Sequence, residues 1–134
     1  MRKLLFLAVA VSVVAGLPAR VDAGVFFTDS FDTYITGSNI AGQGGWETWD
    51  NNPGADTTVV DTQAFNPPNS LLVAGNADIV HTFANVTSGV WHARVMTYVP
   101  STQTGDMFFI LMNTYLPPHS GPDWSAQIAL CKST

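Results

Sequence analysis

Hydrophobic positions along the chain form one long apolar run at the N-terminus and then short runs separated by polar turn residues. The long run covers residues 4–17, and the later runs are rich in Val, Ile, Phe and Thr. Clusters of Gly, Pro, Asn and Asp lie between the short runs, where turns need such residues. This pattern predicts an all-β domain of antiparallel strands, with no amphipathic helix after the apolar run. We expect strands at residues 25–31, 57–64, 70–74, 78–83, 90–99, 107–113 and 124–130.

Residues 1–23 have the three parts of a secretory signal peptide, which we expect to be helical. A basic head (Arg2 and Lys3) precedes the apolar core, and Val21-x-Ala23 supplies the small residues that a signal peptidase recognises. We therefore expect the mature chain to begin at Gly24, with cleavage after Ala19 as the second choice. The apolar run is shorter than the roughly 20 residues that span a bilayer, so we expect no transmembrane segment after cleavage. The predicted destination is the periplasm or the outside of the cell.

The mature chain, residues 24–134, is long enough for one domain and strongly acidic. Removing 23 of the 134 residues leaves 111, which carry two cations, Arg94 and Lys132, against nine acids, a formal net charge of −7. Nucleic acids and anionic lipids bind to clustered Lys and Arg, so the composition excludes both as partners. Cys131 is the only cysteine, so no internal disulfide forms despite export. A secreted or periplasmic bacterial protein fits this composition better than a disulfide-stapled eukaryotic domain.

The clearest alternation lies in the predicted strand at residues 90–99. Its odd-numbered positions, from Trp91 to Val99, are mostly apolar and read as a core face. Its even-numbered positions present His92, Arg94 and Tyr98 on the opposite face. The segment 107–113 is apolar on both faces, which predicts a central strand. The residues that we expect to be buried include Trp91, Val95, Phe109 and Leu111.

A glycine-rich loop at residues 37–50 carries Trp46 and Trp49. Tryptophan offers a large flat apolar surface, on which the C–H face of a sugar ring can stack, while neighbouring polar side chains bind the hydroxyls. The sequence therefore suggests a glycan as the partner, with ligand-binding residues Trp49, His92, Arg94 and Tyr98. The alternative interpretation is structural: Trp46 packs at one end of the domain, and Arg94 pairs with an aspartate.

No catalytic residue is predicted. Glycoside hydrolases usually place two carboxylates across the scissile bond, and the acids of this chain are scattered through loops. The three histidines, His81, His92 and His119, have no zinc-site spacing. No cofactor is expected apart from a structural calcium ion, for which oxygen-bearing side chains in one loop are weak candidates. These side chains are Asp50, Asn52 and Asp56.

The order of several segments resembles the concanavalin A-like lectin/glucanase superfamily, specifically the LamG-like jelly-roll domains of exported bacterial proteins. The resemblance runs from about residue 25 to residue 130 and rests on the segment 29–34, the loop with Trp46, and the segments 69–71, 78–83 and 88–101. It implies an antiparallel jelly-roll β-sandwich with glycans bound on the concave face or at its rim. The glucanase pattern Glu-x-Asp-x-x-Glu is absent. Such domains are usually longer, so residues 24–134 are expected to be an incomplete domain.

Three functions remain open from the sequence. The leading hypothesis is an exported, non-catalytic β-sandwich module that binds carbohydrate. The second is a fragment of a polysaccharide-degrading enzyme, either a glycoside hydrolase or a lyase, and the third is a structural surface or matrix protein. A carboxylate pair would favour the second, and polar and aromatic side chains converging on one surface would favour the first over the third.

Overall fold

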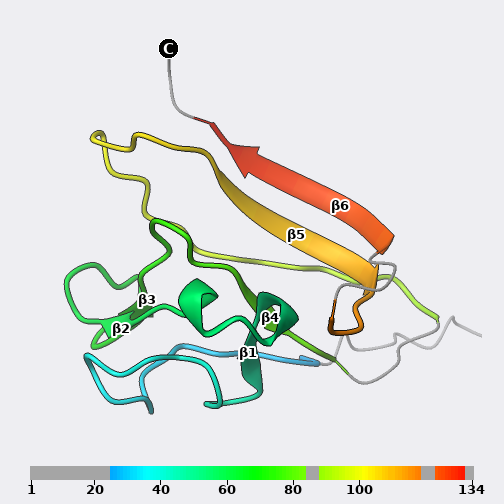
Figure 1. Cartoon of the computed structure of the whole chain (residues 1–134), viewed down its shortest axis with the longest axis horizontal. Helices are drawn as coiled ribbons and strands as arrows, with labels where there is room; N and C mark the ends of the chain where they lie inside the picture. The colour runs from blue at the N-terminus through cyan, green and yellow to red at the C-terminus, as the bar shows by residue number, and fades with distance from the viewer. Residues whose placement is uncertain (1–24, 84–87, 119–122, 132–134) are drawn as a thin grey trace, which may run out of the picture.

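The computed structural model describes residues 25–83, 88–118 and 123–131, and in these ranges the chain is all-β (Figure 1). The predicted class is thereby confirmed. The secondary-structure elements, in chain order, are β1 (Trp46–Thr48), η1 (Trp49–Asn51), η2 (Pro53–Ala55), β2 (Val59–Val60), β3 (Ser70–Leu71), β4 (Ile79–His81), β5 (Met107–Thr114) and β6 (Asp123–Leu130). The two η elements are short 3-10 turns. The expected signal-peptide helix lies outside the described residues.

The strands pair into three antiparallel sheets of two strands each. β1 pairs with β4, β2 with β3, and β5 with β6. The β5–β6 ladder is the longest and runs from the pair Met107–Leu130 to the pair Thr114–Asp123, with register shifts near Met112. The described residues therefore form small antiparallel sheets, and a jelly-roll sandwich of two large sheets is not seen among them.

The core lies under β2 and the loop that precedes β1. Ile40 and Val59 are fully buried, and Ala55 and Val80 are nearly so. Backbone hydrogen bonds hold the loop along β2: Ile40 N donates to Thr57 O at 2.9 Å, and Val59 N donates to Ser38 O, also at 2.9 Å. Residues 38–40 therefore lie alongside β2 and pair with it through their backbone. This packing fixes the position of the glycine-rich loop and β1.

Two of the predicted strands are wrong: residues 25–31 and 90–99 join no ladder in the described part of the chain. Alternation shows which side chains would share a face, but a strand also needs a partner backbone, and no described backbone pairs with either segment. The opposite error occurred at β1, which forms inside the predicted loop. Its three residues pair with β4 in the register Trp46–His81 to Thr48–Ile79.

The expected burial is also wrong for three of four residues. Trp91 is 55% exposed, Val95 is 49% exposed and Leu111 is 39% exposed, while Phe109 is half-buried. Each was predicted to lie between two layers, but the segment 90–99 and the β5–β6 ladder have no second layer over these side chains in the described residues. In the described residues, no helix is long and apolar enough to cross a membrane.

Candidate functional site

Asp29 is the polar centre that fixes the position of Trp46. One carboxylate oxygen, Oδ2, accepts hydrogen bonds from Tyr34 Oη at 2.6 Å and from Trp46 Nε1 at 2.8 Å. The other oxygen, Oδ1, accepts from the backbone N–H of Phe31 at 2.8 Å. Burial, the hydrogen bond to Asp29 and the charge of Asp29 together raise the pKa of Tyr34 to about 12. Trp46 is thus tied into the fold, as the structural interpretation of this residue expects.

His81 on β4 lies next to Trp46 in a cluster of aromatic rings. Its ring centroid is 4.2 Å from that of Phe27, 4.8 Å from that of Phe83 and 5.2 Å from that of Trp46. Its Nε2 lies 3.0 Å from the carbonyl oxygen of Gly44, which assigns a proton to this nitrogen. The Nδ1 atom is buried without a hydrogen-bond partner among the described atoms. His81 therefore packs as an aromatic ring and joins the glycine-rich loop to β4.

Trp49 has different surroundings, although it is only three residues from Trp46. Its ring is half-buried and packs against Tyr115, with the ring centroids 4.8 Å apart and the planes at 40°. The Tyr115 hydroxyl accepts a hydrogen bond from the backbone N–H of Asp50 at 2.8 Å. Asp50 and Asn51 both have positive φ, 54° and 56°, a conformation that Asp and Asn tolerate better than other side chains. This turn brings the end of β5 against η1 and holds the two rings together.

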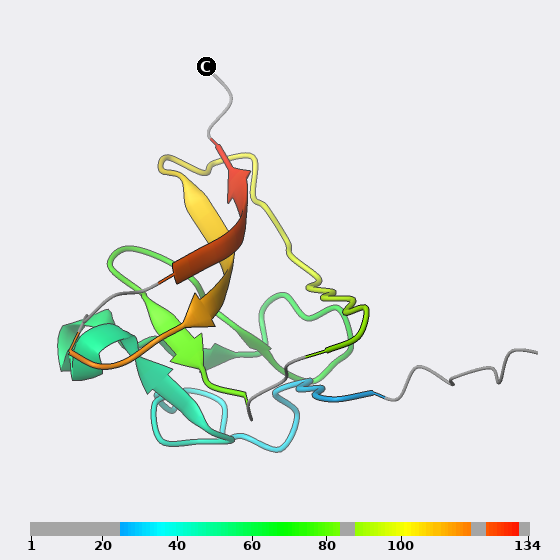
Figure 2. The ribbon, with the colours of Figure 1, turned by 90° about the vertical axis from the view of Figure 1, so that its right-hand side faces the viewer.

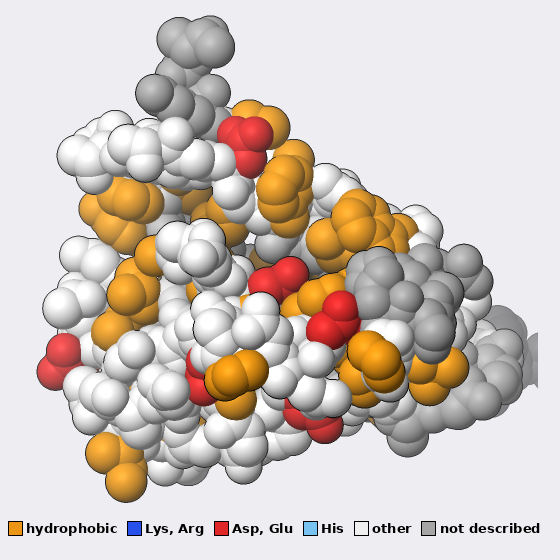
Figure 3. Space-filling model, viewed as in Figure 1, with side chains coloured by type: hydrophobic (Ala, Val, Ile, Leu, Met, Phe, Trp, Pro, Cys, Tyr) orange, Lys and Arg blue, Asp and Glu red, His pale blue; other side chains and the backbone are white. Residues whose placement is uncertain are grey.

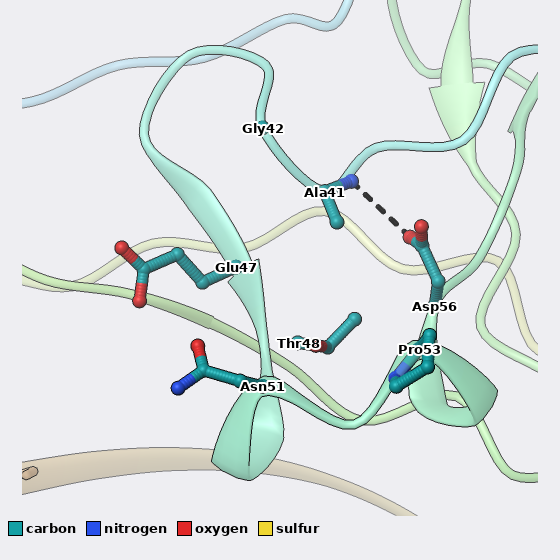
Figure 4. Close-up of a pocket in the computed structure, with 7 residues that line it drawn as sticks. All are labelled: Ala41, Gly42, Glu47, Thr48, Asn51, Pro53 and Asp56. Atoms are coloured by element: carbon teal, nitrogen blue, oxygen red, sulfur yellow. Dashed lines mark hydrogen bonds between the residues drawn. The ribbon is translucent and has the colours of Figure 1, made fainter. Parts of the chain in front are cut away.

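A hollow of about 290 Å³ lies beside η1, and we call it the η1 hollow (Figure 4). Trp49 lies in the chain between Thr48 and Asn51, both of which line it. Figure 4 shows the Glu47 carboxylate and the Asn51 amide pointing to the same side, one from β1 and one from η1. The residues that line the hollow are Ala41, Gly42, Glu47, Thr48, Asn51, Pro53 and Asp56.

Two carboxylates, those of Glu47 and Asp56, belong to the lining of the η1 hollow, and two further acids, Asp50 and Asp78, are close to Trp49 in the chain or through its backbone. The backbone oxygen of Asp78 accepts a hydrogen bond from Trp49 N at 2.9 Å. Burial and the nearby charge of Asp50 raise the pKa of the Asp78 side chain. Figure 3 shows acidic side chains around η1 and η2 and no Lys or Arg among the described residues on this face.

The structure does not bring the predicted ligand-binding residues together. His92, Arg94 and Tyr98 are all exposed and lie in the segment between residues 88 and 103. Figure 2 shows η1 and η2 on one side of the molecule and this segment on the opposite side, with the strands between them. Trp49 therefore belongs to one surface and the other three residues to another.

Two of the three calcium candidates accept hydrogen bonds from backbone N–H groups. Asn52 Oδ1 accepts a hydrogen bond from Gly54 N at 2.9 Å, which caps η2. Asp56 Oδ1 accepts from Ala41 N at 3.1 Å and from Thr57 N at 2.7 Å. Asp50 is part of η1, and its charge acts on Asp78. In the described ranges, no three His, Cys, Asp or Glu side chains are grouped as metal ligands would be.

Sequence reasoning missed Tyr115, Glu47 and Asn51 as parts of this site. Glu47 and Asn51 flank Trp49 in the chain, so proximity to a candidate tryptophan was the available signal. Tyr115 follows the long apolar run of β5, and its contact with Trp49 spans more than 60 residues, which no local pattern reveals. No protein-family model, curated protein or solved structure matches this chain.

Proposed function

We propose that the mature chain is an exported, non-catalytic β-module that binds a carbohydrate at the η1 hollow. The observation that carries the proposal is the Trp49–Tyr115 ring pair: Trp49 follows Thr48, which lines the η1 hollow, and the Glu47 carboxylate and the Asn51 amide point to the same side (Figure 4). The ring pair supplies apolar surface, and Glu47 and Asn51 supply hydrogen-bond acceptors and donors for hydroxyl groups.

The size of the η1 hollow fits this proposal. At about 290 Å³ it lies at the lower end of small-molecule sites, which run from roughly 300 to 1,000 Å³. Such a volume suits one sugar ring of a longer chain, with the rest of the chain lying on the surface. All of its lining comes from one continuous segment, residues 41–56, so the site is built locally, and the Trp49–Tyr115 contact joins this segment to the residue after β5.

Beyond the all-β class, we propose that the fold is a jelly-roll sandwich of the concanavalin A-like type. It is supported by the segment order described above and by the apolar side chains that β5 and β6 leave exposed, which a second layer would cover. These are Phe108, Leu111, Trp124 and Ile128. A crystal structure of the full-length mature protein tests it directly, and a layer count other than two would reject it.

The binding proposal is tested by removing the Trp49 ring. The mature protein is screened on an array of glycans, and the best ligand is measured by calorimetry against the wild type and two variants. We expect Trp49→Ala to weaken binding at least tenfold, about 1.4 kcal/mol. The matched control is Trp124→Ala, which removes an equally large but exposed side chain on β6 and should leave affinity within about twofold.

Folding of Trp49→Ala is checked by far-ultraviolet circular dichroism, because the ring also packs on Tyr115. Should this variant unfold, Glu47→Gln and Asn51→Ala test the same site from exposed positions. The proposal is rejected if no glycan binds, or if Trp49→Ala and Trp124→Ala weaken binding equally.

A second candidate function is polysaccharide hydrolysis, and one observation favours it. Burial, and after it the charge of Asp50, raises the pKa of the Asp78 carboxyl, and Asp50 follows the Trp49 ring in the chain. Glycosidases use two carboxyl groups, one of which is an acid with a raised pKa. The test is release of reducing ends from polysaccharides, abolished by Asp78→Asn and retained by Asp61→Asn. The absence of release from all the glycans that bind would exclude this function.

A further inference from the structure

We propose that the peptide bond between Arg94 and Val95 is a processing site, at which an endopeptidase specific for arginine cuts the folded protein. Hydrolysis adds one water molecule across this amide bond, leaving a carboxylate on Arg94 and an amino group on Val95. The product is a two-chain form of the mature protein, residues 24–94 and 95–134. Cleavage at this bond is independent of carbohydrate binding.

The segment 90–99, which contains this bond, is extended and has no backbone partner. It forms neither helix, ladder nor turn, and all ten of its side chains are exposed. Among the described residues, no hydrogen bond joins the segment to the rest of the protein. Its ring contact is made by Trp91, whose centroid lies 5.6 Å from that of Phe26. A protease binds several substrate residues in an extended conformation, and here no ladder has to open first.

Arg94 supplies the side chain that such a protease recognises. It is the only Lys or Arg in residues 25–83, 88–118 and 123–131, and it forms no ion pair with a carboxylate in these ranges. Its guanidinium stays charged at every physiological pH. Proteases of the trypsin type accept such a group in a pocket that contains an aspartate. Exposed residues flank Arg94 on both sides, so the protease can also reach the neighbouring backbone.

The bond lies between two groups of ladders and crosses neither of them. The pairs β1–β4 and β2–β3 precede it in the chain, and the pair β5–β6 follows it. In contrast, the ring contact between Trp49 and Tyr115 and the hydrogen bond from Asp50 N to Tyr115 Oη join the two parts. Cleavage therefore leaves each described ladder within one fragment, and these contacts hold the fragments together.

The experiment is limited digestion of the mature protein, residues 24–134, with a small amount of trypsin at neutral pH. Intact-mass spectrometry follows the products and separates cleavage after Arg94 from cleavage after Lys132. The reference is a synthetic peptide of residues 88–101 with blocked ends. We expect the folded protein to be cut after Arg94 at a rate within about tenfold of that of the peptide. The cleaved protein should keep its β-type far-ultraviolet circular dichroism spectrum, and Arg94→Gln should abolish both fragments.

A matched control moves the arginine into a ladder. The double variant Arg94→Gln/Gln127→Arg places it at an exposed position of β6, where the pairing with β5 must open before a protease can bind. We expect cleavage at this position to be at least about a hundredfold slower than cleavage after Arg94 in the wild type. Should the double variant unfold, Asn113→Arg in place of Gln127→Arg gives the same comparison on β5.

Three results would overturn the proposal. The first is cleavage of the folded protein after Arg94 more than tenfold slower than cleavage of the peptide, which would show that the segment is protected. The second is equal cleavage rates for the wild type and a folded control variant, which would show that the ladders open as readily as the segment 90–99. The third is loss of the β-type spectrum on cleavage, which would show that the two-chain form does not stay folded.

Discussion

Replacing Asp29 by asparagine tests whether one carboxylate organises the aromatic end of the fold. The carboxylate accepts three hydrogen bonds, from Phe31 N, Tyr34 Oη and Trp46 Nε1. An asparagine has nearly the same shape, but it offers one acceptor oxygen and one NH₂ group. If the amide oxygen of this asparagine points toward Tyr34 and Trp46, its NH₂ group faces the N–H of Phe31, and two donors oppose each other. With the amide reversed, the NH₂ group faces the two other donors.

The expected loss of stability follows from these contacts. Hydrogen bonds to a charged group contribute about 1.5–3 kcal/mol each, and these three are partly buried, which places them at the lower end. Asp29→Asn loses at least one bond and converts the others from charged to neutral acceptors. We therefore expect the free energy of unfolding to fall by about 2 kcal/mol, a large part of the 5–15 kcal/mol typical of a domain.

The assay is urea denaturation at neutral pH, followed by far-ultraviolet circular dichroism so that tryptophan substitutions do not alter the signal. Asp61→Asn, which removes the same charge at an exposed position, serves as the control and should change stability by less than about 0.5 kcal/mol. Trp46→Phe removes only the Nε1–H donor of this network, and a double-mutant cycle with Asp29→Asn should give a coupling energy of about 1 kcal/mol. Equal effects of the two Asp→Asn changes, or zero coupling, would refute the reasoning.

Three further predictions follow from the same region and from the N-terminus. Tyr34 should titrate near pH 12 in a spectrophotometric titration, and Asp29→Asn should lower this pKa. Because the folded pKa exceeds the ordinary tyrosine pKa of 10.0, the associated stability is present below pH 10 and is lost as pH rises toward 12. Gly44→Ala should destabilise by about 2 kcal/mol or more in urea, because the new Cβ would collide with Tyr34 Oη, whereas Gly37→Ala, also at positive φ but in open space, should cost about 1 kcal/mol. N-terminal sequencing of the exported protein should begin at Gly24, and retention of residue 1 would contradict the signal peptide.

Five of the predicted strands contain the observed ladders, and the reason is local. The runs at 57–64, 70–74, 78–83, 107–113 and 124–130 each enclose or nearly match one of β2 to β6. β-branched and aromatic residues favour extended backbone, and Gly, Pro and Asn mark the ends, so each strand could be placed from its own residues. The short strands β2, β3 and β4 are much shorter than predicted, because ladder length is set by the partner strand rather than by propensity.

The errors concern partners, which local patterns do not contain. Residues 90–99 have the clearest alternation in the chain and no described ladder, while β1 pairs with β4 across the 30 residues of intervening chain, 49–78. The core shows the same limitation. Ile40 stands in a loop between two glycines at positive φ, Gly37 and Gly42, and is fully buried because its backbone bonds to Thr57. An isolated isoleucine among glycines gives no periodic signal.

The two tryptophans of the glycine-rich loop are three residues apart in sequence, yet Trp46 has a structural role and Trp49 is a candidate binding residue. Trp46 is on β1, where pairing with β4 aims its Nε1–H at Asp29 and its ring at His81. The chain then leaves the strand, and the left-handed backbone at Asp50 and Asn51 turns it before it can continue along β4. Trp49 is consequently placed against Tyr115 instead of the aromatic cluster. The sequence suggested a role for both rings, but the direction of each depends on a turn conformation and on a tyrosine that lies more than 60 residues further along the chain.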